Sequence, residues 1–265
     1  MSERIQKVLS QWGIASRRRA EKMILAGRIK LNNRIATLGD RVNLDIDRLE
    51  VDDRIIQQLN RPKPIYLLLN KPLKVVSTCR DPQKRTTAID LLPKHLRQGQ
   101  GIHPVGRLDF NSSGALLLTN DGDLTLNLTH PRYHLPKTYH VWLDNCPTAR
   151  DLKLWRQGIM LDERKTLPAK ITILQQNSDK TLLKIVLTEG RNRQIRRIAA
   201  QLGFSVVSLH RTAIASISLQ TQSGQILPSG SYRHLSTSEV TFLRRTFKEA
   251  SFLAASSDSA GHKKL

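Results

Sequence analysis

Cysteine is scarce in this chain. Only Cys79 and Cys146 occur among its 265 residues, and they form no CxxC pair. This spacing argues against both a disulfide framework and a cysteine-based zinc site. We therefore expect the protein to work in a reducing compartment, the cytoplasm.

The chain also lacks a long apolar run. No segment is apolar for long enough to span a bilayer, and the N-terminal stretch MSERIQKVLSQWG is amphipathic and mixed in charge, unlike a signal peptide. Hydrophobic residues still make up 39% of the chain, which is enough for a true core. We predict a globular protein with no membrane partner.

Acidic residues are few relative to basic ones. Asp and Glu number 22 against 43 Lys and Arg, which gives a formal net charge of +21 and a pI near 10.6. A protein this basic is expected to meet a polyanion, most commonly a nucleic acid.

The sequence has no phosphate-binding P-loop and no metal-ligand cluster, so we expect neither a cofactor nor a metal.

The chain divides into a small and a large part. Residues 1–59 are predicted to form a small α/β unit, with helical spacing at Ile5, Val8 and Leu9 and a second helix from Arg17 to Ala26 after a Ser16 cap. Short strands are expected at 28–31 and 47–51. The Pro-containing segment 60–64 is the predicted linker, and the Ser- and Ala-rich tail 250–265 is predicted to be disordered.

Residues 65–249 are predicted to form an α+β domain with a mixed, mainly antiparallel sheet. Helices are expected from Asn120 or Asp121 to Thr129, from Thr148 toward Gly158, and over about 192–202. Strands are predicted where Leu, Val, Ile and Thr gather, at Ile65–Asn70, Val75–Cys79, Ala115–Thr119, Thr138–Leu143, Lys170–Leu174 and Leu182–Leu187.

The basic residues of the small unit gather between positions 16 and 34. Arg18 and Lys22 stand four residues apart and share one face of the predicted helix. Such a surface suits the phosphates of folded RNA, although a charge run is as often only a solvated face. The predicted RNA contacts of this unit are Arg17, Arg18, Lys22 and Arg28.

Two segments of the large domain carry candidate chemistry. Asp109 lies in the loop PVGRLDFNSSG, where flanking glycines allow a sharp bend before a buried strand. A carboxylate held there is placed as a nucleophile or base would be, or it is merely a turn residue. The second segment, EGRNRQIRRI at 189–198, holds four arginines. Helical periodicity places Arg193 and Arg197 on one face for phosphates and Arg196 beside the buried stripe, within reach of a carboxylate.

Taken together, these motifs resemble the pseudouridine synthases that carry an S4-type RNA-binding domain and modify ribosomal RNA. The S4 resemblance rests on RIQKVLSQWGIASRRRAEKMILAGRIKLNNRIATLGDRV, and that of the synthase on LLLNKPLKVVST, PVGRLDFNSSGALLLTNDG, HPRYHLPKTYHV, EGRNRQIRRI and LHRTAI. The family commonly has Gly where Ala215 stands here.

The resemblance implies roles for individual residues. Asp109 would be the catalytic aspartate, Tyr139 would stack on the flipped base and could act as a base, and Arg196 would pair with Asp109. The strand around Leu209 would help enclose the base. The remaining RNA contacts are expected from Arg107, Arg191, Arg193 and Arg197.

The implied function is the isomerisation of one uridine in ribosomal RNA, with large-subunit RNA favoured over small-subunit RNA, by a monomeric enzyme. No cofactor is implied, because the reaction involves no oxidation and no group transfer. Alternatives stay open at this point: a small-subunit or transfer-RNA synthase, a non-catalytic RNA-binding or ribosome-assembly protein, and an RNA hydrolase. The hydrolase would want paired carboxylates, a His pair or metal ligands near Asp109, which the sequence lacks.

Overall fold

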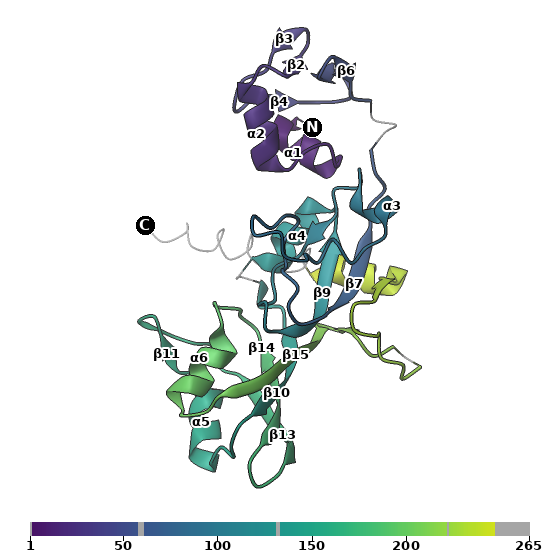
Figure 1. The fold of residues 1–265 in the computed structure, drawn as a ribbon. Helices are drawn as coiled ribbons and strands as arrows, with labels where there is room; N and C mark the ends of the chain where they lie inside the picture. The colour runs from purple at the N-terminus through teal and green to yellow at the C-terminus, as the bar shows by residue number, and fades with distance from the viewer. Residues whose placement is uncertain (1, 58–60, 131–132, 222, 247–265) are drawn as a thin grey trace, which may run out of the picture.

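The computed structural model describes residues 2–57, 61–130, 133–221 and 223–246. The predicted disordered tail lies outside these residues, as does the first position of the predicted linker. Two bodies follow one another along the chain, the small N-terminal one and the large one (Figure 1). Among the described helices, none has both the length and the apolar character needed to cross a bilayer.

The N-terminal body packs two helices against small sheets. The helices are α1 (Ile5–Gln11) and α2 (Arg17–Leu25), and Ser16 caps α2 as predicted by accepting a hydrogen bond from the Arg19 backbone N–H. Ile5 and Leu9 are fully buried between them. The strands are β2 (Ile29–Leu31), β3 (Arg34–Ile35), β5 (Leu49–Val51) and β6 (Arg54–Ile55) in the order β3-β2-β5-β6, and β1 (Glu3–Arg4) with β4 (Arg41–Val42).

One nine-stranded sheet organises the large body. Seven of its strands follow the order β13-β14-β10-β15-β9-β7-β17, while β16 pairs with β15 and β8 with β9 beside this path. All its strand pairs are antiparallel except β9 with β15, which confirms a mixed, mainly antiparallel sheet. Its strands are β7 (Tyr66–Lys71), β8 (His103–Pro104), β9 (Ser113–Thr119), β10 (Lys137–Leu143), β13 (Lys170–Gln176), β14 (Thr181–Leu187), β15 (Val206–Ile214), β16 (Ile217–Ser218) and β17 (Tyr232–His234).

Several helices accompany the sheet of the large body. The helices are α3 (Lys94–Arg97), α4 (Gly122–Thr129), α5 (Ala149–Gln157) and α6 (Gln194–Gln201), and a further helix covers 237–246. Asp121 caps α4 and Thr148 caps α5, as the sequence predicts. A short hairpin of β11 (Met160–Leu161) and β12 (Arg164–Lys165) lies beside α6 in Figure 1.

Two predictions for this domain are wrong or incomplete. The segment Val75–Cys79 forms no strand and contributes only an isolated bridge from Val76 to Thr87, because Lys71 and the turn after it direct the chain away from the sheet. The strand β17 and the helix over 237–246 were not predicted. Strand β17 pairs with β7, which is far away in sequence.

The two bodies touch through backbone. Gly13, after α1, approaches the loop at 99–101 so closely that a Cβ on Gly13 would lie 2.4 Å from the carbonyl oxygen of Gly99. An ion pair of 2.9 Å joins Lys7 of α1 to Asp123 of α4. The N-terminal body is therefore docked on the side of the large domain that carries α4.

Candidate active site

A cavity of about 270 Å³ opens on one face of the nine-stranded sheet. Its walls come from the β8–β9 loop, from β10 and β15, and from the turn between β14 and α6. Asp109, Tyr139, Arg196 and Leu209, which the sequence singles out, all line it, together with Arg107, Arg191 and Arg193. Segments about a hundred residues apart in sequence thus meet at one place.

Asp109 lies in the loop between β8 and β9, and its side chain is 36% exposed. Ser77 fixes the chain just before it, because the Ser77 hydroxyl donates to the carbonyl oxygen of Leu108 and accepts from its N–H. A turn follows, in which the Ser112 N–H donates to the Asp109 carbonyl at 3.0 Å. The carboxylate is therefore held at the cavity by backbone anchored on both sides.

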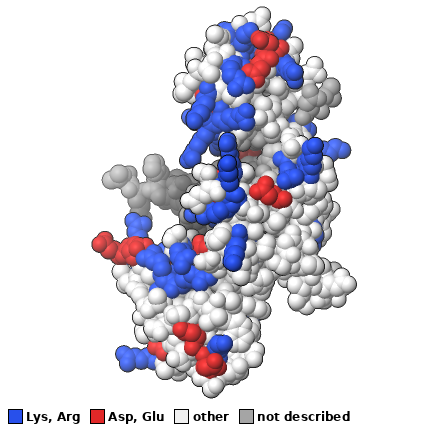
Figure 2. Space-filling model, viewed as in Figure 1, with Lys and Arg blue, Asp and Glu red and all other residues white. Residues whose placement is uncertain are grey.

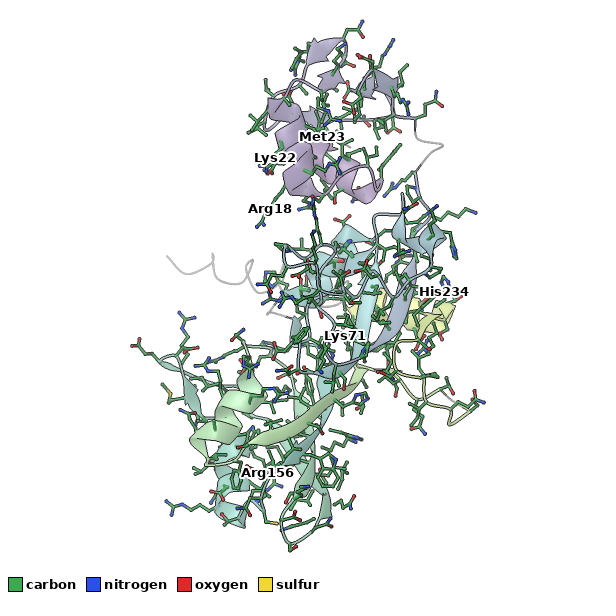
Figure 3. The ribbon with its side chains drawn as sticks, in the orientation of Figure 1. Arg18, Lys22, Met23, Lys71, Arg156 and His234 are labelled. Atoms are coloured by element: carbon green, nitrogen blue, oxygen red, sulfur yellow. The ribbon has the colours of Figure 1, made fainter. Side chains whose placement is uncertain are left out.

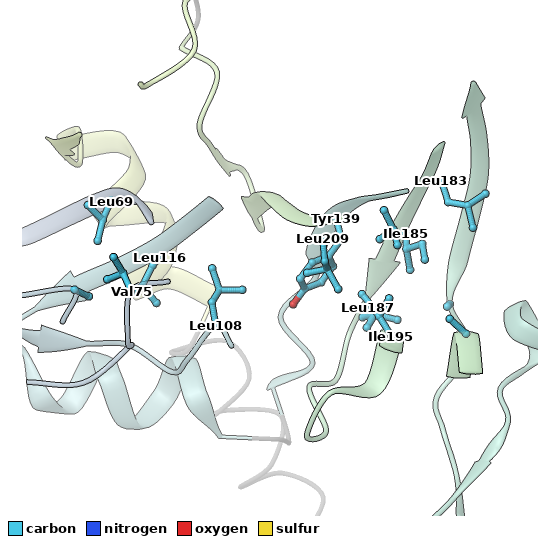
Figure 4. Packing of buried hydrophobic residues seen from close by; sticks show 14 of the residues in the cluster. Leu69, Val75, Leu108, Leu116, Tyr139, Leu183, Ile185, Leu187, Ile195 and Leu209 are labelled. Carbon is cyan, nitrogen blue, oxygen red and sulfur yellow. The ribbon is translucent and has the colours of Figure 1, made fainter. Parts of the chain in front are cut away.

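Tyr139 projects from β10 into the cavity and is only 8% exposed. In Figure 4, Tyr139 lies next to Leu209, and Leu108 lies across from both of them. Leu108 directly precedes Asp109 in the chain. The ring and the carboxylate thus face a common space. A planar ring in such a position offers a stacking surface to a planar ligand.

The ion pair of Asp109 differs from the prediction. Its partner is Arg193, whose Nη1 lies 3.8 Å from Oδ2 of Asp109, and not Arg196. The helical periodicity misplaced Arg193 because α6 begins only at Gln194, and Arg193 precedes it in the left-handed conformation, with φ 49°. This backbone geometry turns the side chain toward the cavity, away from the face of Arg197.

The side chain of Arg196 binds the backbone of the loop that carries Asp109. One of its Nη atoms donates to the carbonyl oxygen of Asn111 at 2.6 Å, and the other to that of Val206 at 3.2 Å. Burial lowers the pKa of Arg196, as does the charge of Arg193, while Asp109 raises it. The carboxylate is thus within electrostatic range of Arg196, although the two form no ion pair.

Arg191 and Arg197, both predicted to contact RNA, have intramolecular partners. Arg191 donates to the carbonyl oxygens of Leu161, Arg164 and Lys165 in the β11–β12 hairpin. Arg197 makes a bidentate ion pair with Asp162 in the same hairpin. Their main contacts therefore fix the hairpin to α6, which the sequence did not reveal.

The basic residues of α2 are free of such partners. Arg17, Arg18 and Lys22 are exposed, and none of them forms an ion pair with a described residue. Arg18 and Lys22 project from the same side of the helix (Figure 3). Arg28 differs, because it is engaged with Asp52 at 2.6 Å. Figure 2 shows Lys and Arg side chains running down this face from the N-terminal body to the region of α6.

Three cations near the cavity were not predicted from the sequence: the buried Lys71 and Arg211 and the partly buried Lys137. Lys137 and Arg211 line the cavity, and Lys71 is fully buried at the end of β7 (Figure 3). Strand alternation could have found them, since each stands two residues from a side chain of a predicted strand or of the predicted site, namely Leu69, Tyr139 and Leu209.

These cations influence one another. Burial lowers the pKa of Lys71 to about 8, with Asp109 raising it and Arg211 lowering it. Burial likewise lowers the pKa of Lys137, and Arg211 lowers it further. A positive potential therefore surrounds the single carboxylate, Asp109, that faces the cavity without dense hydrogen bonding.

The second carboxylate of the cavity wall, Glu189, is already occupied. It accepts hydrogen bonds from the Leu167 N–H, from the Gln194 amide and from Arg191. A carboxylate with this many donors is a structural support for the β14–α6 turn. Asp109 is thus the less occupied of the two carboxylates in the cavity wall.

Comparison with known proteins agrees with this geometry. The profile of the RNA pseudouridylate synthase family matches residues 65–201, more than half of the chain, and that of the S4 domain matches residues 3–45. The chain belongs to the RNA pseudouridylate synthase family. It is therefore an enzyme that carries an S4 domain in front of its synthase domain, as the sequence predicted.

Similar synthases match nearly the whole chain. A ribosomal large subunit pseudouridine synthase B of Bacillus subtilis (strain 168) is 38% identical over 245 residues, 91% of this chain and 96% of its own length. An uncharacterised RNA pseudouridine synthase of Aquifex aeolicus (strain VF5) is also 38% identical, over 92% of this chain and 94% of its own. A crystal structure of a pseudouridylate synthase superimposes with a TM-score of 0.64 at 30% identity, covering 91% of this chain and 99% of that one.

Proposed function

We propose that this synthase isomerises a specific uridine of large-subunit ribosomal RNA to pseudouridine, with Asp109 as its catalytic carboxylate. The observation that carries the proposal is the cavity in which a half-buried Asp109 faces the ring of Tyr139. The choice of large-subunit RNA rests on similar proteins named ribosomal large subunit pseudouridine synthase B, from Bacillus subtilis and, at 35% identity, Pseudomonas aeruginosa.

The reaction requires the uridine to leave its stack, which costs a few kcal/mol and is repaid inside the protein. Tyr139 lines the cavity, so its ring can stack on the extruded base, and such stacking contributes about 1–3 kcal/mol. Arg107, exposed at the mouth of the cavity, is suited to hold the backbone of the flipped nucleotide. The apolar walls, including Leu108 and Leu209, exclude water from the broken glycosidic bond.

Asp109 then acts on the ribose as a nucleophile or as a base, both of which need the ionised carboxylate. Arg193 pairs with this carboxylate at 3.8 Å. Arg196 serves as a positioning residue, because its hydrogen bond to the Asn111 carbonyl fixes the loop that carries Asp109. Its proposed role thus changes from charge partner to support of the loop.

The decisive test is the substitution Asp109→Asn. Asn is nearly isosteric, so fold and RNA affinity should be kept, whereas turnover should fall by several orders of magnitude. Pseudouridine is mapped in ribosomal RNA from cells lacking the protein and complemented with wild type or variant, with the melting temperature of the purified proteins as a control. Substantial activity in a folded Asn variant would return Asp109 to the role of a turn residue.

The same map assigns the substrate. A pseudouridine that disappears from large-subunit RNA in the absence of the protein supports the proposal. Loss of a small-subunit or transfer-RNA pseudouridine instead would contradict the choice of RNA while leaving the reaction intact.

A further inference from the structure

Arg211 is buried in the cavity wall with its hydrogen bonding incomplete. It lies on β15, opposite Tyr139 of β10 and beside Gly114 of β9. Cross-strand partners share a face of the sheet, so the Arg211 side chain lies on the side of Tyr139. The residue is 4% exposed and its Nε donates to the carbonyl oxygen of Ala115 at 2.7 Å, but its buried Nη2 has no hydrogen-bond partner.

The charge of Arg211 is also uncompensated. Among the described residues it forms no ion pair, since Asp109 is paired with Arg193, and Glu189 is occupied by other donors. Lys71 and Lys137, whose pKa values Arg211 lowers, are themselves cationic. A buried guanidinium in such surroundings is strongly unfavourable unless a ligand supplies an acceptor and negative charge.

The reaction produces negative charge in this space. The N1–C1′ bond breaks and its electron pair stays on the uracil, delocalised over N1 and the two carbonyl oxygens. On the ribose side, Asp109 either bonds to C1′ as a nucleophile, in which case this bond breaks again when C5 attacks C1′, or takes the C2′ proton as a base and later returns it. The C5–C1′ bond then forms, C5 loses its proton and N1 gains one, so that all atoms are retained. The anionic base therefore needs donors that Asp109 cannot provide.

We propose that Arg211 is a further catalytic residue, whose guanidinium at the cavity wall donates to a carbonyl oxygen of the uracil and stabilises the anion formed when the glycosidic bond breaks. This inference rests on the proposed function. A fixed donor in a water-poor site is effective because it is oriented before the charge appears. Lys71 and Lys137 add positive potential from ammonium groups that already donate to the backbone carbonyls of Pro72, Val75 and Leu135.

A phosphate of the flipped nucleotide would offer Arg211 the same oxygen chemistry. A phosphate, however, carries its charge before the reaction as well as during it, so removing a phosphate-binding arginine would weaken RNA binding. Removing a donor to the uracil anion would slow the chemical step and leave binding unchanged. The two sources are therefore separable by affinity and rate.

The test uses Arg211→Met and Arg211→Lys in the full-length protein, with an RNA fragment that contains the target uridine. We expect dissociation constants close to that of wild type and a single-turnover rate at saturating RNA about 100-fold lower for Met, on the scale of losing one donor to a developing anion. Arg211→Lys should retain part of the rate. The control is Arg233→Met, a partly buried arginine of β17 outside the cavity, which should keep the wild-type rate.

A second RNA carries 5-fluorouridine at the target, whose more acidic base leaves more easily. The rate of loss of the target nucleoside should then depend less on Arg211, and the Arg211→Lys defect should shrink. An equal defect on both RNAs, or weakened binding with an unchanged rate, would overturn the proposal and indicate a structural or phosphate-binding role. If wild type forms no pseudouridine in any RNA, the proposed function itself fails, whereas a normal rate in the Arg211 variants with active wild type removes only this inference.

Discussion

At the scale of single residues, the buried Lys71 shows how the site shapes stability. Its side chain is fully enclosed, and burial lowers its pKa from 10.5 to about 8. Its ammonium group donates to two backbone carbonyls, of Pro72 and Val75. Burial of the protonated Lys71 side chain therefore costs free energy below pH 8, and this cost reduces the stability of the fold.

We expect this cost to be visible as a pH dependence. Between about pH 8 and 10.5 the folded protein releases the Lys71 proton while the unfolded chain keeps it, so the stability of wild type relative to Lys71→Met should rise with pH. The full rise should be on the order of 3 kcal/mol. Urea unfolding of both proteins at a series of pH values measures it, and a difference that stays constant across this window would contradict the assigned pKa.

Ala215 carries strain at the end of β15. It adopts φ 51°, a left-handed conformation that costs a residue with a Cβ about 1–2 kcal/mol. Glycine avoids this strain but loses about 0.4–1 kcal/mol of chain entropy on folding. Ala215→Gly should therefore stabilise the protein by roughly 0.5–1 kcal/mol. The matched control Ala213→Gly, in the regular part of β15, should destabilise it, and thermal melts that rank the two variants the other way would refute this reading of the turn.

At the scale of elements, the parallel contact of β9 with β15 is what brings the Asp109 loop to Arg211. The two strands pair at His210 with Ser113 and at Arg211 with Gly114. Gly114 has φ 109°, and a Cβ there would lie 2.2 Å from the carbonyl oxygen of Arg211. Only glycine fits, because the obstacle is backbone that cannot rotate away.

We accordingly expect Gly114→Ala to destabilise the protein by on the order of 3 kcal/mol or more, from overlap and backbone strain together. The control is Gly122→Ala at the start of α4, where a Cβ meets no atom within 4 Å and the variant should be neutral or slightly stabilised. Urea midpoints give the comparison. Equal midpoints for the two variants would contradict this prediction, because they would mean that β9 and β15 can move apart at little cost in free energy.

At the scale of the whole molecule, the S4 domain is set against the synthase domain so that its basic helix lies on the same face as further basic residues near α6 (Figure 2). The backbone contact of Gly13 with the loop at 99–101 fixes this arrangement. The S4 domain should therefore supply affinity for RNA phosphates while the cavity supplies chemistry.

Reversing Arg17, Arg18 and Lys22 to Glu should weaken RNA binding and flatten its salt dependence, by about 0.7–0.9 in the log–log slope for each phosphate that the protein no longer neutralises. The control reverses Lys153, Lys170 and Lys180, three exposed lysines of α5, β13 and the turn after it, which changes the net charge equally at the far end of the molecule. Filter-binding titrations over a range of salt measure both. Similar salt-dependence slopes for the two triple variants would contradict the prediction that the basic residues of the S4 helix contact RNA phosphates.

Much of this protein could be predicted from local sequence patterns. Helix caps at Ser16, Asp121 and Thr148, the apolar strands and the order of the motifs depend on neighbouring residues, so local patterns predict them. The same motifs brought Asp109 and Tyr139 to attention, and the structure places both at one cavity.

The ion pairs, by contrast, depend on how the chain folds in three dimensions. The left-handed Arg193 forms the ion pair with Asp109 that the family resemblance implied for Arg196, and Arg191 and Arg197 contact the β11–β12 hairpin. Arg211 entered the cavity because β15 crosses beside Gly114 of β9. Partners of a long, flexible side chain depend on segments far away in sequence, and these become neighbours only when the sheet is assembled.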